Sequence, residues 1–181
     1  MRRICIFCGA NPGLDPEFQQ QALNLADAMA ARKIGLVYGG SSTGLMGVIA
    51  DRALEHNSEV IGIMPTNLVD TEIAHTGLTE LMEVSSMSDR KQAMQETADA
   101  FVALPGGYGT LDELFEALTN AQLHLHSKPV GILNVNGYFD SLLTFLDQAE
   151  QQGLLKSYNR RLLKVGTTPE ELLENLFQKQ K

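Results

Sequence analysis

The sequence predicts an α/β protein built on a doubly wound, mostly parallel sheet with helices on both faces. Short apolar runs rich in β-branched residues alternate along the chain with longer amphipathic segments, which is the pattern of successive strand–helix units. Clusters of glycine follow three of these runs, as is typical where a buried strand turns into a helix. The 181 residues suit one domain, expected to span residues 1–181.

The predicted elements follow from hydrophobic periodicity. Strands are expected at Arg3–Cys8, Gly35–Tyr38, Glu59–Met64, Ala100–Leu104, Val130–Leu133 and Leu162–Val165. Helices are expected at Pro16–Arg32, Gly44–His56, Asp89–Thr97, Thr110–Leu125, Tyr138–Gln152 and Pro169–Gln178. The first helix shows the period clearly, because Phe18, Ala22, Leu25, Ala26 and Met29 fall on one face. The long stretch from Pro65 to Thr79 shows no periodicity and is a candidate lid or binding loop.

Composition narrows the classes of partner. A net charge of −8 argues against a nucleic-acid backbone as the main partner, because such proteins need a basic surface. The apolar run at the N-terminus is far too short for a signal peptide, and no stretch approaches the roughly 20 apolar residues of a membrane span. We therefore expect a cytoplasmic protein without membrane or nucleic-acid partners.

Cys5 and Cys8 form a C-x-x-C pair, a spacing found in redox and zinc sites. They lie in an apolar run that reads as a strand, where an odd spacing places two side chains on opposite faces. A redox pair instead sits at a helix N-terminus, and a zinc site needs further ligands. Both residues are interpreted as structural thiols.

Three glycine clusters, Gly9–Gly13, Gly39–Gly47 and Gly106–Gly109, follow predicted strands. Each could be a simple tight turn, because glycine permits positive φ and close backbone approach. In a parallel sheet, however, all three would meet at the carboxyl edge, where backbone N–H groups and helix N-termini bind anions without net positive charge. This arrangement suits an acidic chain that binds a phosphorylated ligand.

The glycine motifs exclude several familiar nucleotide sites. The first turn, G-A-N-P-G, lacks the G-x-G-x-x-G of a dinucleotide fold, and no acidic residue follows the second strand. The G-K-[ST] of a Walker A loop is also missing. Gly40 to Gly44 matches the G-x-S-x-G of a hydrolase, but no histidine follows on a late loop. Gly40 and Ser42 are instead predicted to support a loop that binds phosphate or ribose.

Glu113 has two interpretations. Thr110-Leu111-Asp112-Glu113 is a capping box, in which Thr110 would cap the helix and Glu113 would reach back to it. The preceding Pro105-Gly106-Gly107-Tyr108-Gly109 is not needed for such a box, and its glycines make the loop harder to order. A carboxylate beside a phosphate-binding turn would face the sugar, so we favour a functional Glu113.

Arg90 and Lys91 open another predicted helix and are among the few cations of this acidic chain. An exposed surface pair is the ordinary interpretation. Their position near the expected sheet edge also suits an oxyanion, which arginine can bind through two hydrogen bonds.

With both segments identified, the chain resembles the LONELY GUY (LOG) family of phosphoribohydrolases, which release the free base from cytokinin riboside 5′-monophosphates. The match spans nearly the whole chain and is most specific at residues 105–113, P-G-G-Y-G-T-L-D-E, and at Arg90-Lys91 within M-x-x-R-K. Gly39-Gly40 and the following G-L-M-G also look like the family's second glycine loop.

The resemblance implies a Rossmann-like fold, a homodimer and catalytic roles for Arg90 and Glu113. It further implies a substrate site for a nucleoside 5′-monophosphate (AMP-like). This site would be lined by Glu72, Lys91, Gly107, Tyr108, Gly109, Thr110, Leu111, Asp112 and Thr119. No cofactor is implied. No metal is expected either, because His56, His75, His124 and His126 show no ligand spacing tied to an acidic partner. An old label of lysine decarboxylase on some members has no supporting lysine motif here.

The expected reaction is attack of water at C1′ of the nucleotide through an oxocarbenium-like transition state, which a carboxylate stabilises in glycoside hydrolysis. Two alternatives remain open on the sequence. One is a module that carries a nucleotide without cleaving it. The other is a general AMP nucleosidase, because the residues around the base are unassigned.

Overall fold

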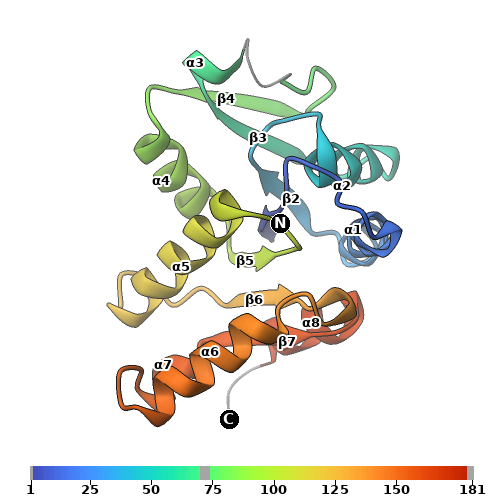
Figure 1. The fold of residues 1–181 in the computed structure, drawn as a ribbon. Coiled ribbons are helices and arrows are strands. Elements are labelled where there is room, and N and C mark those ends of the chain that lie inside the picture. Colours follow the sequence, from blue (N-terminus) through green and yellow to red (C-terminus); the bar gives the residue numbers. More distant parts are fainter. Residues whose placement is uncertain (1, 70–73, 179–181) are drawn as a thin grey trace.

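A seven-stranded sheet organises the residues, 2–69 and 74–178, that the computed structural model describes (Figure 1). The strands are β1 (Arg3–Phe7), β2 (Gly35–Tyr38), β3 (Val60–Pro65), β4 (Glu80–Val84), β5 (Ala100–Ala103), β6 (Val130–Leu133) and β7 (Leu163–Gly166). Their order is β4-β3-β2-β1-β5-β6-β7, and every neighbouring pair is parallel. The predicted α/β fold with a doubly wound parallel sheet is confirmed.

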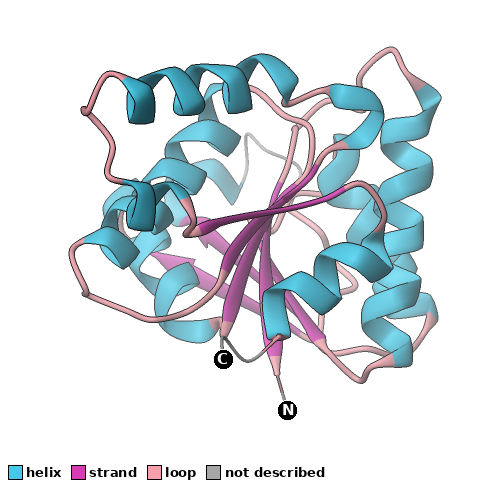
Figure 2. Cartoon of the chain, turned by 90° about the horizontal axis from the view of Figure 1, so that it is seen from below, coloured by secondary structure: helices cyan, strands magenta, loops and turns pink. Residues whose placement is uncertain are grey.

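Helices cover both faces of this sheet (Figure 2). They are α1 (Pro16–Ala31), α2 (Gly44–Glu55), α3 (Thr66–Val69), α4 (Met87–Thr97), α5 (Tyr108–Gln122), the 3₁₀ turn η1 (Val135–Gly137), α6 (Asp140–Gln151), α7 (Ser157–Arg160) and α8 (Pro169–Phe177). One hydrophobic cluster packs α1, α2 and α8 on one face, and a second packs α4, α5 and α6 on the other. None of the helices in the described ranges is long and apolar enough to cross a bilayer.

β1 lies at the centre of the sheet and is buried on both faces. Ile4 and Ile6 belong to one hydrophobic cluster, whereas Cys5 and Phe7 belong to the other. Cys8 joins the cluster of Ile4, so the two thiols lie on opposite sides of the sheet, as the strand interpretation requires. Burial raises the pKa of both thiols, which makes them poor nucleophiles.

The predicted face of α1 is confirmed, because Ala22, Leu25, Ala26 and Met29 are all buried in the core. The start of this helix is set locally. Asp15 accepts a hydrogen bond from the Glu17 backbone N–H at 2.9 Å, and proline occupies the first turn.

The edge strand β4 is the main element that the sequence did not predict. Its residues E-L-M-E-V are only partly buried, and their apolar positions do not alternate regularly. Among the described strands it pairs with β3 alone, so it forms one edge of the sheet. An edge strand of this kind has a weak hydrophobic pattern because it is covered on fewer sides.

Several helix boundaries differ from the prediction. Helix α4 begins at Met87 and not at Asp89, because Ser86 caps it by accepting from the Asp89 N–H at 3.1 Å. Helix α6 begins at Asp140, after the separate turn η1, and the short helix α7 was not predicted. The stretch expected to be irregular contains the end of β3 and the short helix α3. The predicted site residue Glu72 lies outside the described residues.

Candidate active site

Three glycine turns meet at the carboxyl ends of β1, β2 and β5, as the sequence predicts. The Gly9 N–H donates to the carbonyl of Pro105 at 3.1 Å, which joins the turn after β1 to the turn after β5. The carbonyl of Gly9 in turn accepts from the Leu45 N–H of α2 at 3.1 Å. Because the strand order reverses between β1 and β5, this is the position where ligands bind in doubly wound folds.

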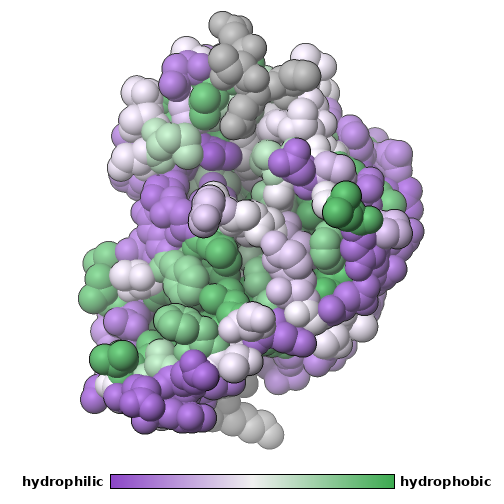
Figure 3. Space-filling view, viewed as in Figure 1, coloured by the Kyte–Doolittle hydropathy of each residue, from purple (hydrophilic) through white to green (hydrophobic). Residues whose placement is uncertain are grey.

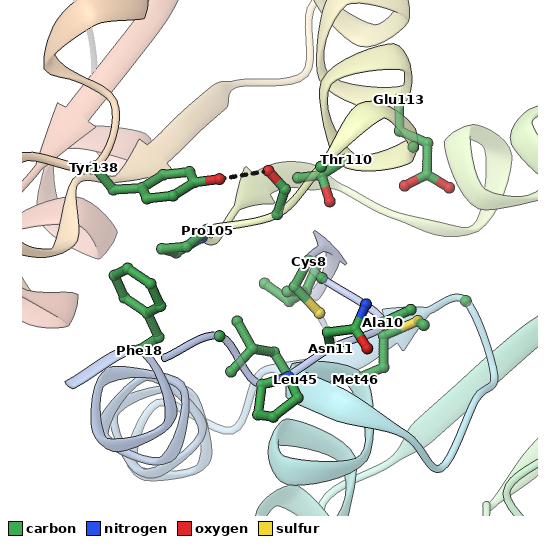
Figure 4. Close-up of a pocket in the computed structure, with 18 of the residues that line it drawn as sticks. Cys8, Ala10, Asn11, Phe18, Leu45, Met46, Pro105, Thr110, Glu113 and Tyr138 are labelled. Carbon is green, nitrogen blue, oxygen red and sulfur yellow. Dashed lines mark hydrogen bonds between the residues drawn. The ribbon is translucent and has the colours of Figure 1, made fainter. Parts of the chain in front are cut away.

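A cavity of about 430 Å³ opens at this edge (Figure 4). Its walls come from the three turns, the starts of α2 and α5, and single side chains of other elements. The lining residues are Ile6, Cys8, Gly9, Ala10, Asn11, Pro12, Gly13, Phe18, Gly39, Leu45, Met46, Arg90, Pro105, Gly106, Gly107, Gly109, Thr110, Glu113 and Tyr138. The volume lies within the usual range of sites for small ligands.

Arg90 enters the cavity from α4 and is held there by backbone carbonyls. Its Nε donates to the carbonyl of Ile63 at 3.0 Å, and its Nη2 donates to that of Gly39 at 3.4 Å. Gly39 also makes the space for this side chain, since a Cβ there would lie 2.1 Å from Nη2. The guanidinium is therefore fixed before any ligand binds.

Glu113 lies opposite Arg90, on α5. The Oε1 of Glu113 is 3.6 Å from Nη1 of Arg90, and both side chains are 12% exposed. Burial raises the pKa of the Glu113 carboxyl to about 7, although the positive charge of Arg90 opposes this shift. A carboxyl group with this pKa can exchange a proton with a substrate or water near neutral pH.

The predicted capping box is wrong. Helix α5 begins at Tyr108, two residues earlier than expected, and its N-cap is Gly107, which makes no side-chain capping bond. Thr110 is buried inside the first turn, where its Oγ1 lies against Gly106 so closely that a Cβ there would be only 2.1 Å away. The glycine turn lets the helix start early, and Glu113 is left to face the cavity and Arg90.

The structure divides the predicted substrate-binding residues among several places. Gly107, Gly109 and Thr110 line the cavity together with Arg90 and Glu113. Others line a separate open groove of about 520 Å³ along α5, namely Lys91, Tyr108, Leu111, Asp112 and Thr119. Gly40 and Ser42 follow β2 but belong to the lining of neither.

The ammonium of Lys91 is engaged by two carboxylates of α5. Its Nζ lies 2.6 Å from an oxygen of Glu116 and 3.1 Å from one of Asp112. These contacts raise the pKa of Lys91, the hydrogen bond to Glu116 most of all. Lys91 therefore joins α4 to α5 beside the Arg90–Glu113 pair.

Sequence reasoning missed several lining residues. Asn11 and Met46 lie in glycine clusters that were identified, but no side chain there was singled out. Phe18 comes from α1, where its spacing indicated only a place on the buried helix face, and Tyr138 comes from the segment after β6, outside the three glycine clusters. Only the tertiary fold brings these two rings to the site, and no local pattern could have indicated it.

Two histidines have acidic partners, which the spacing of the sequence does not indicate. His56 Nε2 lies 2.6 Å from Asp27 Oδ1, and His75 Nε2 lies 2.9 Å from Asp51 Oδ1. Each thus has an acidic partner more than 20 residues away in sequence, which spacing alone could not reveal. No group of three or more potential metal-ligating His, Cys, Asp or Glu side chains occurs within residues 2–69 and 74–178.

Known proteins are similar to this chain over nearly its whole length. A family model described as "Possible lysine decarboxylase" matches residues 46–176. The cytokinin riboside 5′-monophosphate phosphoribohydrolase LOG7 of Arabidopsis thaliana is 45% identical over 175 residues, which cover 97% of this chain and 81% of that protein. A probable enzyme of the same name, LOGL3 of Oryza sativa subsp. japonica, is 46% identical over 97% of this chain and 83% of its own length.

The chain belongs to the LOG family. The decarboxylase description finds no support in this LOG cavity, because no lysine is among the described residues that line it. The cavity instead contains the Arg90–Glu113 pair that the family resemblance singles out.

Solved structures extend the fold beyond the LOG relatives. The molybdenum cofactor binding protein of Rippkaea orientalis matches 96% of this chain and 93% of its own, with a TM-score of 0.71 and 22% identity. The molybdenum cofactor carrier protein of Chlamydomonas reinhardtii matches with a TM-score of 0.70 and 20% identity over 94% and 92% of the two chains. At these identities the likeness shows a common fold alone.

Proposed function

We propose that this LOG-family chain hydrolyses the N-glycosidic bond of N6-modified adenosine 5′-monophosphates, releasing the free base and ribose 5-phosphate. The observation that supports this most directly is the Arg90–Glu113 pair, buried 3.6 Å apart in a cavity walled by glycine turns. The relatives with about 45% identity over nearly the whole chain are named for this activity.

The 5′-phosphate binds at the start of α5 in this proposal. The first backbone N–H groups of any helix lack partners within it and carry partial positive charge. At α5 these groups belong to the turn of Gly107 and Gly109. Apart from adjacent residues and the helix backbone, no atom of the described residues lies within 4 Å of the space where a Cβ of either glycine would be. A phosphate can therefore approach the backbone closely, which explains how a chain of net charge −8 binds an anion.

Placing the phosphate at the start of α5 puts the ribose near Glu113, two turns of helix or less from the anion. Water attacks C1′ as the bond from C1′ to the base breaks, and the bonding electron pair leaves with the base. The carboxylate of Glu113 stabilises the cationic character of the sugar and accepts a proton from water. This proton then passes to the departing base, so that one water supplies both the hydroxyl on C1′ and the proton on the base. Arg90 binds the charged or leaving portion of the substrate.

One incubation tests this proposal. Purified protein is mixed with AMP and, separately, with N6-isopentenyl-AMP, and free base and ribose 5-phosphate are quantified by chromatography. Release from the N6-modified nucleotide with a higher kcat/KM than from AMP supports the proposal. Equal or better cleavage of AMP would show a general AMP nucleosidase, and no release from either would show a nucleotide carrier.

We also propose that the chain acts as a homodimer. Apolar side chains gather on the face formed by α5 and α6 (Figure 3). On α6 the side chain of Phe145 is 62% exposed, and Leu125, just after the end of α5, is 71% exposed. Phe115 of α5 and Leu142 of α6 are partly buried. A second copy of the chain would cover this surface, which is the usual arrangement of symmetric oligomers. A cytoplasmic location stays a prediction of the sequence.

A further inference from the structure

Tyr138 reaches the cavity from an element that no glycine motif indicates. It follows the turn η1 after β6, and its hydroxyl donates a 2.8 Å hydrogen bond to the carbonyl of Gly106 (Figure 4). Gly106 lies in the turn that leads into α5, so this single bond connects the β6 side of the molecule to the phosphate-binding turn.

Two aromatic contacts hold the Tyr138 ring in place. Phe18 of α1 meets it edge to face, with centroids 5.3 Å apart and ring planes at 80°. Phe139 meets it in the same manner at 5.0 Å and 89°. Gly13, at φ +78°, leaves room for Phe18, because a Cβ there would lie 2.6 Å from that ring. Edge-to-face pairs of this kind fix ring orientation as well as position.

The segment that carries Tyr138 is itself anchored. Asn136 Nδ2 donates to Asp15 Oδ2 at 3.0 Å, which ties η1 to the capping residue of α1. The side-chain oxygen of Asn134 accepts from the Phe139 N–H at 2.8 Å. The backbone is therefore anchored both before Tyr138, at Asn136, and after it, at Phe139.

The bond to Gly106 has a direct effect on the next amide group. In a planar trans peptide the C=O of one residue and the N–H of the next point in opposite directions, and the described chain contains no cis bond. Fixing the Gly106 carbonyl therefore fixes the N–H of Gly107, the N-cap of α5. Neither glycine has a side chain that could hold this peptide, and Gly107 has open space around it.

We propose that Tyr138 is a positioning residue that preorganises the phosphate-binding turn by fixing the Gly106–Gly107 peptide. This inference rests on the proposed function, because it concerns how the same nucleotide is held. Tyr138 takes no part in bond breaking. Its contribution is equal in the ground state and the transition state, so its loss raises KM and leaves kcat unchanged.

The test is Tyr138→Phe, which keeps both aromatic contacts and removes only the hydroxyl. The expected result is a KM for the nucleotide about three- to tenfold higher, the value of one hydrogen bond, with kcat within about twofold of wild type. The dissociation constant for ribose 5-phosphate, measured by calorimetry, rises by the same factor, and the melting temperature does not change. The matched control is Tyr158→Phe on α7, which alters none of these values.

An unchanged affinity of Tyr138→Phe for ribose 5-phosphate would overturn the inference, and so would a loss of kcat with KM retained. Because calorimetry measures binding without cleavage, it tests the positioning role of Tyr138 separately from the proposed hydrolysis. If wild type binds ribose 5-phosphate but cleaves neither nucleotide, the proposed function falls, and weaker binding by Tyr138→Phe still supports the positioning role. If wild type does not bind ribose 5-phosphate, both fall.

Discussion

Glu113 is kept in a state that costs the protein stability. Burial raises the pKa of its carboxyl group from 4.5 to about 7, so ionisation is less favourable in the folded chain than in the unfolded chain. Below pH 4.5 the group is protonated in both states and has no effect. Between pH 4.5 and about 7 the carboxyl group is ionised in the unfolded chain but still protonated in the folded chain, so the free energy of unfolding falls as the pH rises.

We therefore expect Glu113→Gln to lose activity and gain stability above pH 7. The catalytic loss should be about 10²–10⁴ in kcat/KM, the usual contribution of one acid–base or electrostatic group. The free energy of unfolding should rise by about 3 kcal/mol at pH 8 and should not change near pH 4. Chemical denaturation of both proteins at the two pH values measures this. A variant that is less stable at pH 8 would contradict the buried, partly protonated carboxyl.

The activity of wild type should follow the same ionisation. If the carboxylate form of Glu113 is required, log(kcat/KM) rises with pH and levels off above about 7. A profile that falls through this range would instead assign Glu113 the role of a proton donor. Initial rates between pH 5 and 9 distinguish the two results.

Gly39 shows how one missing side chain controls Arg90. A Cβ at this position would lie 2.1 Å from the Arg90 Nη2, so Gly39→Ala should push the guanidinium aside and lower kcat/KM by about 10²-fold. The fold should survive, because a flexible side-chain end can move. The control is the same substitution in an Arg90→Ala background, where little further loss is expected. Equal losses in both backgrounds would show that Gly39 acts on something other than Arg90.

At the scale of elements, α4 and α5 form the pair of helices that holds the charged centre. Two sets of ionic contacts join them, Arg90–Glu113 inside the cavity and Lys91 with Asp112 and Glu116 beside it. The second set also affects the first, because the charge of Lys91 lowers the pKa of Glu113 whereas Asp112 and Glu116 raise it.

Lys91→Met should consequently move the acid limb of the kcat/KM profile to higher pH, since two carboxylates near Glu113 lose their counter-charge. Lys91→Arg keeps the charge and should leave the limb in place. If the methionine variant weakens substrate binding without moving the limb, Lys91 contacts the substrate directly, as the family resemblance implies.

At the start of α5 we expect a substitution that stabilises the helix to weaken binding of the nucleotide. Gly109 has no positive φ and no neighbour where a Cβ would lie, so alanine fits the folded chain. Gly109→Ala should stabilise the helix by up to about 1 kcal/mol while raising KM for the nucleotide, because the new methyl group occupies the space where phosphate approaches. Thermal melts and initial rates check both effects, and an unchanged KM would remove Gly109 from the site.

Elements could be predicted from sequence where burial was complete. The strands β1, β2, β3, β5 and β6 are continuous apolar runs, and their bounds agree with the prediction within about a residue. The edge strand β4 was missed because partial exposure weakens its pattern. The early start of α5 was missed for another reason: its first residues are Tyr108 and Gly109, and glycine rarely signals the inside of a helix.

For the whole molecule, the alternation of strands and helices was enough to predict the architecture, and hence the edge where the glycine turns meet. The site itself was predicted in part. Arg90, Glu113 and the glycines of the α5 turn come together as expected, because each follows directly from a strand end or a helix start. Phe18 and Tyr138 could not be predicted, since their approach depends on packing between segments 120 residues apart.

The oligomeric state can be checked at this scale. Light scattering after size exclusion should give twice the chain mass of 19.8 kDa. Phe145→Glu places a charge on the exposed apolar face of α6 and should shift the mass to that of a monomer, whereas Tyr158→Glu on α7 serves as a comparison at another exposed aromatic. A wild-type protein that elutes as a monomer at micromolar concentration would contradict the dimer.

The central position of β1 has a consequence for how the chain is made. Although β1 precedes the other described strands, its pairing with β5 requires residues 100–103, and Tyr138 follows later still. A ribosome must therefore release all the elements between β1 and β5 before β1 is covered on both edges. Until then one edge of β1 is unpaired, and unpaired strand edges are prone to aggregation. The cavity is built from turns on both sides of this interval, so it cannot form before β5 has paired with β1.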